Sequence, residues 1–215
     1  MKIKFPLILA LIYLFYNTGF SQTDVKQETI NADFNLDSAV NSNYNYMYGL
    51  MDSAEINYKT GNYFRALNYY DTILEVYGTK YILENYNEDS SKNTLLEVFA
   101  QTSSKLYNQR GATRLKLEDL NGALQDFDLA IKYNTKNTNA RFDKAITLGR
   151  LGRFEESLLS FNEVLNIDNS NHFAFFLRGS VKADLGDMEG ACQDWKKAKE
   201  LGNQSVNTYI ETYCK

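Results

Sequence analysis

The feature that most constrains this chain is a pattern that recurs every 34 residues between positions 104 and 205. Three columns of the pattern each hold one kind of side chain: a minimal residue, a second small residue, and a large aromatic ring. The minimal column is Gly111, Ala145 and Gly179, the small column is Ala123, Ser157 and Ala191, and the aromatic column is Phe127, Phe161 and Trp195. A fixed period of this length is typical of repeats that stack, because one repeat cannot bury its apolar face alone.

Each copy of the pattern contains two stretches of helical spacing with a short turn between them. The turn falls at Glu118, Gly152 and Gly186 in the three copies. The chain has 215 residues and a single proline, Pro6, so its helices are expected to end at asparagine and glycine turns rather than at proline. The sequence therefore predicts an all-α fold, an α-solenoid of antiparallel helix pairs.

Three segments carry a resemblance to a known family. They are Tyr107–Gly111, Gly152–Ser157 and Gly186–Ala191, each followed by its aromatic residue. On these segments the chain resembles the tetratricopeptide repeat (TPR) family over roughly residues 47–205. The family's proline at the end of each repeat is absent, and Thr135, Asn169 and Asn203 stand in its place. The resemblance implies a right-handed superhelix whose concave face is built from the first helix of each pair.

These patterns predict how the chain is divided. The expected segments are a signal peptide at 1–21, a flexible lead-in at 22–45, and a TPR domain at 46–215, which comprises a degenerate repeat at 47–80, an insertion at 81–103, repeats at 104–137, 138–171 and 172–205, and a cap at 203–215. The insertion is expected to extend or precede the first helix of the next repeat, and it is a candidate site of function. The alternative is that it is only a drifted half-repeat. In the cap, Val206 and Ile210 are expected to point inward.

The first 22 residues have the pattern of a secretory signal peptide. Lys2 and Lys4 precede an apolar run at Phe5–Tyr16, and the small residues Gly19 and Ser21 precede a possible cut before Gln22. The alternative, a membrane anchor, is disfavoured because the apolar run is shorter than the roughly 20 residues that span a bilayer. We therefore expect an exported protein, periplasmic or secreted, that has no membrane segment after cleavage.

Export changes the interpretation of Cys192 and Cys214, which are the only two cysteines. Outside the cytosol two cysteines more often pair than stay free, so the sequence predicts a disulfide that pins the cap to the last repeat. In the chain-entropy model such a loop contributes roughly 3 kcal/mol. The alternatives are two unpaired thiols or a metal site, and the second lacks a ligand set because the single histidine is distant.

Charged residues recur within two of the repeats. Arg110 is followed 16 residues later by Asp126, and Arg178 is followed in the same way by Asp194. The intervening copy has Lys144 and Ser160, so the acid is lost where the arginine is lost. We predict two ion pairs between the helices of a repeat, each contributing about 0.5–1 kcal/mol if half exposed.

The sequence offers no set of catalytic or cofactor-binding residues. The single histidine, His172, has no obvious nucleophile partner and is expected to be a solvated residue at a helix start. The glycines lack the spacing of a phosphate-binding loop, and Asp168–Asn171 lacks the later residues of a calcium loop. No enzyme activity, cofactor or metal is expected. A formal net charge of −4 without a basic patch disfavours nucleic acid as a partner.

If the first helices line a groove, side chains three and four residues apart on them face a ligand. This candidate peptide groove comprises Lys105, Asn108, Lys116, Phe142, Ile146, Arg150, Phe173 and Phe176. It predicts an aromatic floor suited to an extended or helical peptide, with a basic edge formed by Lys59, Lys116 and Arg150. The alternative is that the phenylalanines pack between repeats. The Lys and Asn set with which some TPR proteins hold a chaperone carboxylate is not reproduced, because Phe142 and Phe176 occupy its places.

The function that follows is an exported scaffold that binds another protein or peptide through its concave face. The alternative is a structural subunit of a larger cell-envelope or secretion assembly, held through its outer surfaces or through the 81–103 insertion. The partner's identity does not follow from the sequence.

Overall fold

The computed structural model describes the backbone of residues 36–76 and 92–215 and the side chains of residues 46–75 and 97–215. The predicted signal peptide lies outside the described residues. The chain forms two compact units, residues 1–53 and residues 54–215. The described part of the first unit is the beginning of helix α3, and all the other helices belong to the second unit.

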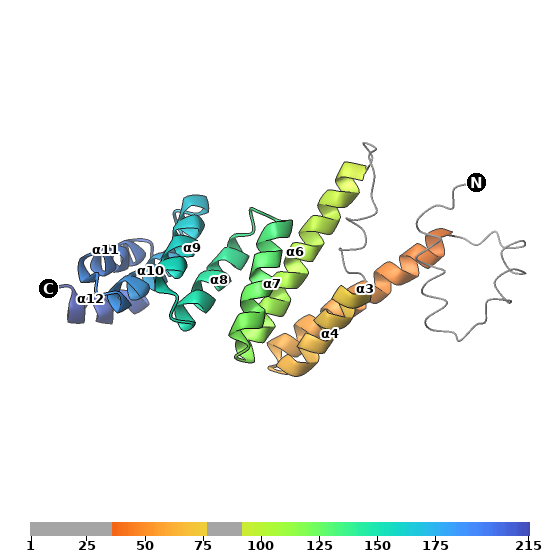
Figure 1. The fold of residues 1–215 in the computed structure, drawn as a ribbon, viewed down its shortest axis with the longest axis horizontal. Helices are drawn as coiled ribbons and strands as arrows, with labels where there is room; N and C mark the ends of the chain where they lie inside the picture. The colour runs from red at the N-terminus through yellow and green to blue at the C-terminus, as the bar shows by residue number, and fades with distance from the viewer. Residues whose placement is uncertain (1–35, 77–91) are drawn as a thin grey trace, which may run out of the picture. The chain divides into compact units, whose positions relative to one another are not determined.

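The described residues are all-α and contain no strand. The helices are α3 (Leu36–Lys59), α4 (Tyr63–Val76), α6 (Lys92–Lys116), α7 (Leu120–Tyr133), α8 (Thr138–Arg150), α9 (Phe154–Ile167), α10 (His172–Asp184), α11 (Met188–Glu200) and α12 (Asn207–Tyr213), with a short 3₁₀ turn η1 (Gln204–Val206) before the last. Within the second unit, α6 packs on α7, α8 on α9 and α10 on α11, as Figure 1 shows. The predicted solenoid of antiparallel helix pairs with a C-terminal capping helix is confirmed.

Helix α3 begins earlier than the sequence analysis anticipated. Residues 36–45, predicted as part of a flexible lead-in, are helical. The sequence carries a reason, because Leu36, Val40 and Tyr44 recur every four residues and continue the spacing of the helix that follows.

The two kinds of turn are built from different residues. Within a repeat, the chain reverses through a residue of positive φ, which is Gly152 (73°) or Gly186 (86°) but Glu118 (64°) in the first clear copy. Between repeats, Asn137 and Asn171 cap α8 and α10, each accepting a backbone N–H at 3.0 Å. Asparagine caps thus begin these helices where the family's proline is missing, since an Asn side chain satisfies an otherwise unpaired N–H.

The repeating columns form the contact inside each pair. Phe127, Phe161 and Trp195 are at most 2% exposed. A Cβ on Gly179 would stand 2.8 Å from the Trp195 ring, so only glycine allows this approach. In the middle copy the hydroxyl of Ser157 donates to the carbonyl of Ala145 at 2.7 Å, which satisfies the one polar side chain in the small column.

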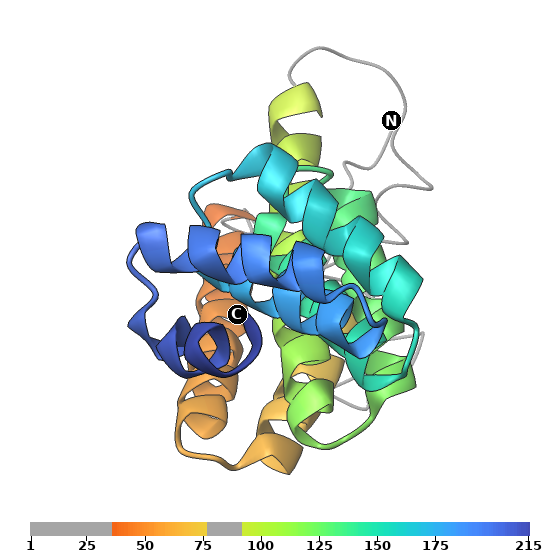
Figure 2. The same ribbon diagram turned by 90° about the vertical axis from the view of Figure 1, so that its left-hand side faces the viewer.

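The C-terminal segment closes the last repeat, as Figure 2 shows. Val206 is fully buried, and Ile210 packs with it against Ala191, Trp195 and Ala198. Neither α12 nor any other described helix has the length and apolarity required to cross a bilayer.

Candidate functional site

Helix α6 is almost twice as long as the first helices of the two repeats that follow it. It has 25 residues, against 13 in α8 and 13 in α10. The extra length comes from residues 92–103 of the predicted insertion, whereas residues 81–91 lie outside the described part. Residues 92–110 contain neither glycine nor proline, so nothing in the sequence interrupts the helix.

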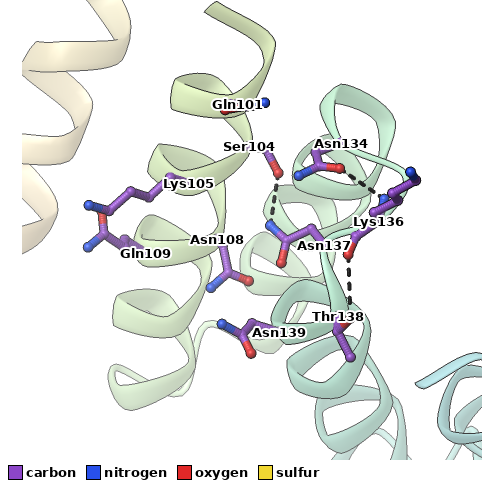
Figure 3. A pocket seen from close by; sticks show the side chains of 10 residues that line it. All are labelled: Gln101, Ser104, Lys105, Asn108, Gln109, Asn134, Lys136, Asn137, Thr138 and Asn139. Atoms are coloured by element: carbon purple, nitrogen blue, oxygen red, sulfur yellow. Dashed lines mark hydrogen bonds between the residues drawn. The ribbon is translucent and has the colours of Figure 1, made fainter. Parts of the chain in front are cut away.

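The extended α6 forms one wall of a polar pocket with a volume of about 560 Å³ (Figure 3). The opposite wall is the α7–α8 turn and the start of α8. The lining is Gln101, Ser104, Lys105, Asn108 and Gln109 from α6 with Asn134, Lys136, Asn137, Thr138 and Asn139. The lining residues carry six carboxamides, two hydroxyls and two ammonium groups, with no acidic and no apolar side chain among them. The size is within the range of ligand pockets in proteins.

Hydrogen bonds fix the wall of the pocket. The hydroxyl of Ser104 donates to the carbonyl of Ala130 at 2.7 Å and accepts from Nδ2 of Asn137 at 2.8 Å. The Oδ1 of Asn137 is held by the α8 cap, so this carboxamide has one orientation. By contrast, Oδ1 of Asn108 is buried with no hydrogen-bond partner among the described residues. A buried acceptor without a donor is costly, so this carboxamide is an unsatisfied polar group in the wall of the pocket.

The predicted groove residues lie in different environments. Lys105 and Asn108 line the pocket. Phe142 and Ile146 are partly buried and pack against the core of the α8–α9 pair, and Phe142 meets the Phe161 ring edge-on at 5.9 Å.

The alternative interpretation therefore describes the remaining aromatics better. Phe176 is partly buried against the cap, with its ring 5.2 Å from that of Tyr209. Only Phe173 is exposed, at 56%. The rings of Phe142 and Phe176 are partly covered by neighbouring helices. The sequence alone does not show which helix packs against which ring.

The predicted basic edge is also partly neutralised. Arg150 forms an ion pair with Glu118 and donates to the carbonyl of Leu115. Lys59 pairs with Glu55 at 2.6 Å. Lys116 is exposed and forms no ion pair with a described residue.

Both arginine–aspartate pairs join the two helices of a repeat. The guanidinium of Arg110 donates to Asp126 at 2.9 and 2.6 Å, and that of Arg178 donates to Asp194 at 2.8 and 2.6 Å. They differ from the expectation in burial, since the side chains of Asp126 and Asp194 are 1% and 5% exposed. Each acid also has a second cation that the sequence analysis missed, Arg114 or Lys182, at 3.0 or 2.9 Å.

The second cations belong to a repeat column from which their pairing with the acids could have been predicted. Arg114, Leu148 and Lys182 are 34 residues apart, and the copy without an acid has the leucine. Burial raises the pKa of Asp126, and the hydrogen bonds and charge of Arg110 oppose that rise. The charge of Arg114 also opposes the effect of burial on the pKa of Asp126.

A second column of first-helix cations, Arg110, Lys144 and Arg178, contacts the preceding repeat. Asp71 lies 2.9 Å from Arg110, Asp128 lies 2.7 Å from Lys144, and Asn162 lies 2.7 Å from Arg178. Asp128 and Asn162 are 34 residues apart, and Asp71 matches them once the turns at Gly61 and Glu118 are aligned. Every first-helix cation of this column is therefore held by an oxygen of the second helix before it.

Asp143 is a partly buried acid with a different environment. Its carboxylate has no hydrogen bond or ion pair among the described residues, and burial raises its pKa to about 6 despite the charge of Lys116. It lies four residues after Asn139 on α8. Its charge in turn raises the pKa of Tyr58 on α3, although burial is the larger cause.

The remaining predicted residues lie at the C-terminal end. Cys192 and Cys214 form a disulfide that joins α11 to the end of α12, with their Cα atoms 5.6 Å apart. His172 is partly buried, not solvated as expected: its ring lies 4.2 Å from that of Phe173, and its Nδ1 has no described partner. The described residues contain no cluster of side chains that could hold a metal ion.

No family model matches the chain. Among curated proteins, the human DnaJ homolog subfamily C member 7 is 26% identical over 112 residues, which are 52% of this chain and 23% of that protein. The Arabidopsis thaliana peptidyl-prolyl cis-trans isomerase FKBP42 is 38% identical over 81 residues, 38% of this chain and 21% of that protein. The chain thus matches about a fifth of the length of these relatives.

Solved structures agree with the architecture. MamA superimposes with a TM-score of 0.60 at 15% identity over 79% of this chain and 86% of that one. The first TPR of Spaghetti (RPAP3), bound to the HSP90 peptide SRMEEVD, gives 0.51 at 17% identity over 53% and 92%. YrrB, described as a TPR protein with an unusual peptide-binding site, gives 0.50 at 20% identity over 82% and 97%. The fold of this chain is therefore TPR-like.

Proposed function

We propose that this TPR-like chain is a protein-binding scaffold that holds a peptide segment of another protein on the face formed by its first helices. The observation that carries the proposal is the polar pocket between α6 and α8. Its carboxamides match the donors and acceptors of a peptide backbone, and Lys105 and Lys136 suit an acidic side chain or a terminal carboxylate. The pocket also joins the two surfaces that the sequence left open, because Gln101 comes from the insertion and Lys105 from the repeat.

Similar proteins support this assignment by analogy. The RPAP3 domain binds a peptide that contains two glutamates, and YrrB has a peptide-binding site. Both share the fold alone with this chain, so the residues that would bind its partner must be argued from this structure.

A peptide display selection with the folded protein tests the proposal. Selected dodecapeptides should bind Lys105→Ala and Asn139→Ala each about tenfold more weakly, since a hydrogen bond to a charged group contributes about 1.5–3 kcal/mol and 1.4 kcal/mol is tenfold. Lys132→Ala on α7 and Asn166→Ala on α9 change the same residue types at exposed positions of second helices and should bind as the wild type does. Equal losses at the pocket and control positions would refute the assignment.

We propose in addition that the chain is exported and works in the periplasm or outside the cell. The charged and apolar pattern of residues 1–21 and the Cys192–Cys214 disulfide support this, because disulfides persist in oxidising compartments. Mass spectrometry of the protein from its own cells should give an N-terminus at Gln22. Recovery of the intact Met1 form from the cytosol would contradict export.

A structural subunit of a larger assembly is the second candidate, and one observation favours it. The second helix α9 exposes Leu159 at 63% and Ile167 at 50%. If these side chains seat in a neighbouring subunit, Leu159→Asp should dissociate a stoichiometric complex purified from the native cells, whereas Lys105→Ala should leave it intact.

A further inference from the structure

The carboxylate of Asp143 is unusual among the buried acids of the described chain. Asp126 and Asp194 are each held by two cations within 3.0 Å. Asp143 is also partly withdrawn from water, but its carboxylate has no ion pair and no hydrogen bond to any described residue. A carboxylate partly withdrawn from water without a partner is destabilising, and such acids are candidates for binding a group from outside the chain.

The position of Asp143 connects it with the pocket. Residues four apart on a helix lie on the same side, and Asn139, four residues earlier on α8, lines the pocket. The groups that act on the carboxylate come from two other first helices, Lys116 at the end of α6 and Tyr58 on α3. All of these residues belong to the second unit, and they come from the first helices of three consecutive repeats, α3, α6 and α8.

Charge is therefore sorted along this face. The pocket contributes two lysines and no acid, and Asp143, one helical turn further along α8, contributes an acid that feels the charge of Lys116 but forms no ion pair with it or with another described residue. We propose that Asp143 binds a lysine or arginine side chain of the peptide segment whose polar or acidic part occupies the pocket. This inference rests on the proposed function and specifies the chemistry of its partner.

Helix geometry sets the spacing within that segment. Four residues of helix rise about 6 Å, and an extended peptide advances about 3.3 Å for each residue. The basic residue is therefore expected about two positions from the residue that contacts Asn139.

Parallel selections from a random dodecapeptide display library test this inference, with wild-type protein and with Asp143→Asn as baits. Asparagine keeps the shape of the side chain and removes its charge. Wild-type selections should be enriched in Lys or Arg at one fixed position, and that enrichment should disappear with Asp143→Asn. A selected peptide should also bind the variant about tenfold more weakly, whereas its Arg→Gln derivative should bind both proteins equally. Asp184→Asn, the same change at an exposed position of α10, should behave as the wild type.

The outcomes separate this inference from the proposed function. If wild-type protein selects peptides that depend on Lys105 but show no basic preference, or if Asp143→Asn keeps that preference, the assignment of Asp143 is overturned and peptide binding stands. If no peptide is enriched on wild-type protein, both are overturned. Circular dichroism of each variant confirms that the compared proteins are folded.

Discussion

Replacement of Asp143 by asparagine should make the folded protein more stable at neutral pH. Burial raises the pKa of the Asp143 carboxyl from its ordinary 3.8 to about 6. One pKa unit corresponds to about 1.4 kcal/mol, so ionisation of this group costs the folded state about 3 kcal/mol. Asparagine has no charge to desolvate, although its amide still needs hydrogen bonds, so about 3 kcal/mol is the upper limit of the gain.

The effect should depend on pH with a definite sign. Because the folded pKa is raised, wild-type protein gains stability from this group as the pH falls from about 6 toward 3.8. Above pH 6 the carboxyl is ionised in both the folded and the unfolded states, and the whole cost is present. The advantage of Asp143→Asn should therefore be largest at pH 7.5 and close to zero below pH 4.

Urea unfolding at pH 7.5 and at pH 4.0, followed by circular dichroism, measures both quantities. Asp184→Asn is the matched control and should change the free energy of unfolding by less than about 0.5 kcal/mol at either pH, as exposed substitutions do. A wild-type protein that is more stable than Asp143→Asn at pH 7.5 would show that the carboxylate has a stabilising partner within the chain. A residue that weakens the fold and strengthens binding is the expected signature of a functional acid.

Three further predictions concern the repeats themselves. Asp194→Ala leaves two largely buried cations without their acid and should lower the free energy of unfolding in urea by about 3 kcal/mol. Asp128→Ala removes a 54%-exposed acid and should lower it by less than about 1 kcal/mol. Equal losses in the two variants would contradict the role of burial. Gly179→Ala forces a Cβ to 2.8 Å from the Trp195 ring and should lower stability by about 1–3 kcal/mol, whereas Gly149→Ala, whose nearest atom is at 3.5 Å, should be neutral or gain up to about 1 kcal/mol. Reduction of the cap disulfide, with its 22-residue separation, should lower the free energy of unfolding by about 3 kcal/mol, and no change with dithiothreitol would contradict it.

The repeat period predicts most of the architecture from the sequence alone. Residues 34 apart share an environment only if the repeats stack, and that constraint fixes the helix pairs and the packing of Gly179 on Trp195. The pairing of Arg110 with Asp126 follows from the same columns. Each of these features depends on contacts inside one repeat, where sequence spacing determines distance.

Features that depend on two repeats were harder to predict. The contact of Asp71 with Arg110 is hidden by the insertion, because the two residues fall in register only after the turns at Gly61 and Glu118 are aligned. The pocket was missed for a related reason: it requires α6 to continue back through Gln101.

The degree to which the predicted groove aromatics are covered could not be predicted from the sequence. Phe142 and Phe176 have the spacing of ligand-facing residues, yet one is covered by a ring of its own helix pair and the other by the cap. The absence of an ion pair at Asp143 could not be predicted either, because it depends on which side chains the other helices place near its carboxylate.

The contacts between consecutive repeats have a consequence for how such a chain can change its length. If residues 138–171 were removed as a block, Arg178 would face Asp128 where Lys144 had been, and a cation would again meet an oxygen ligand. This contact thus accepts either neighbour, whereas the ion pair of Arg150 with Glu118 would be lost, because Asp184 would stand in the place of Arg150. Asp143 would be lost in that deletion, so the scaffold could shorten while forfeiting the group that we propose selects its partner.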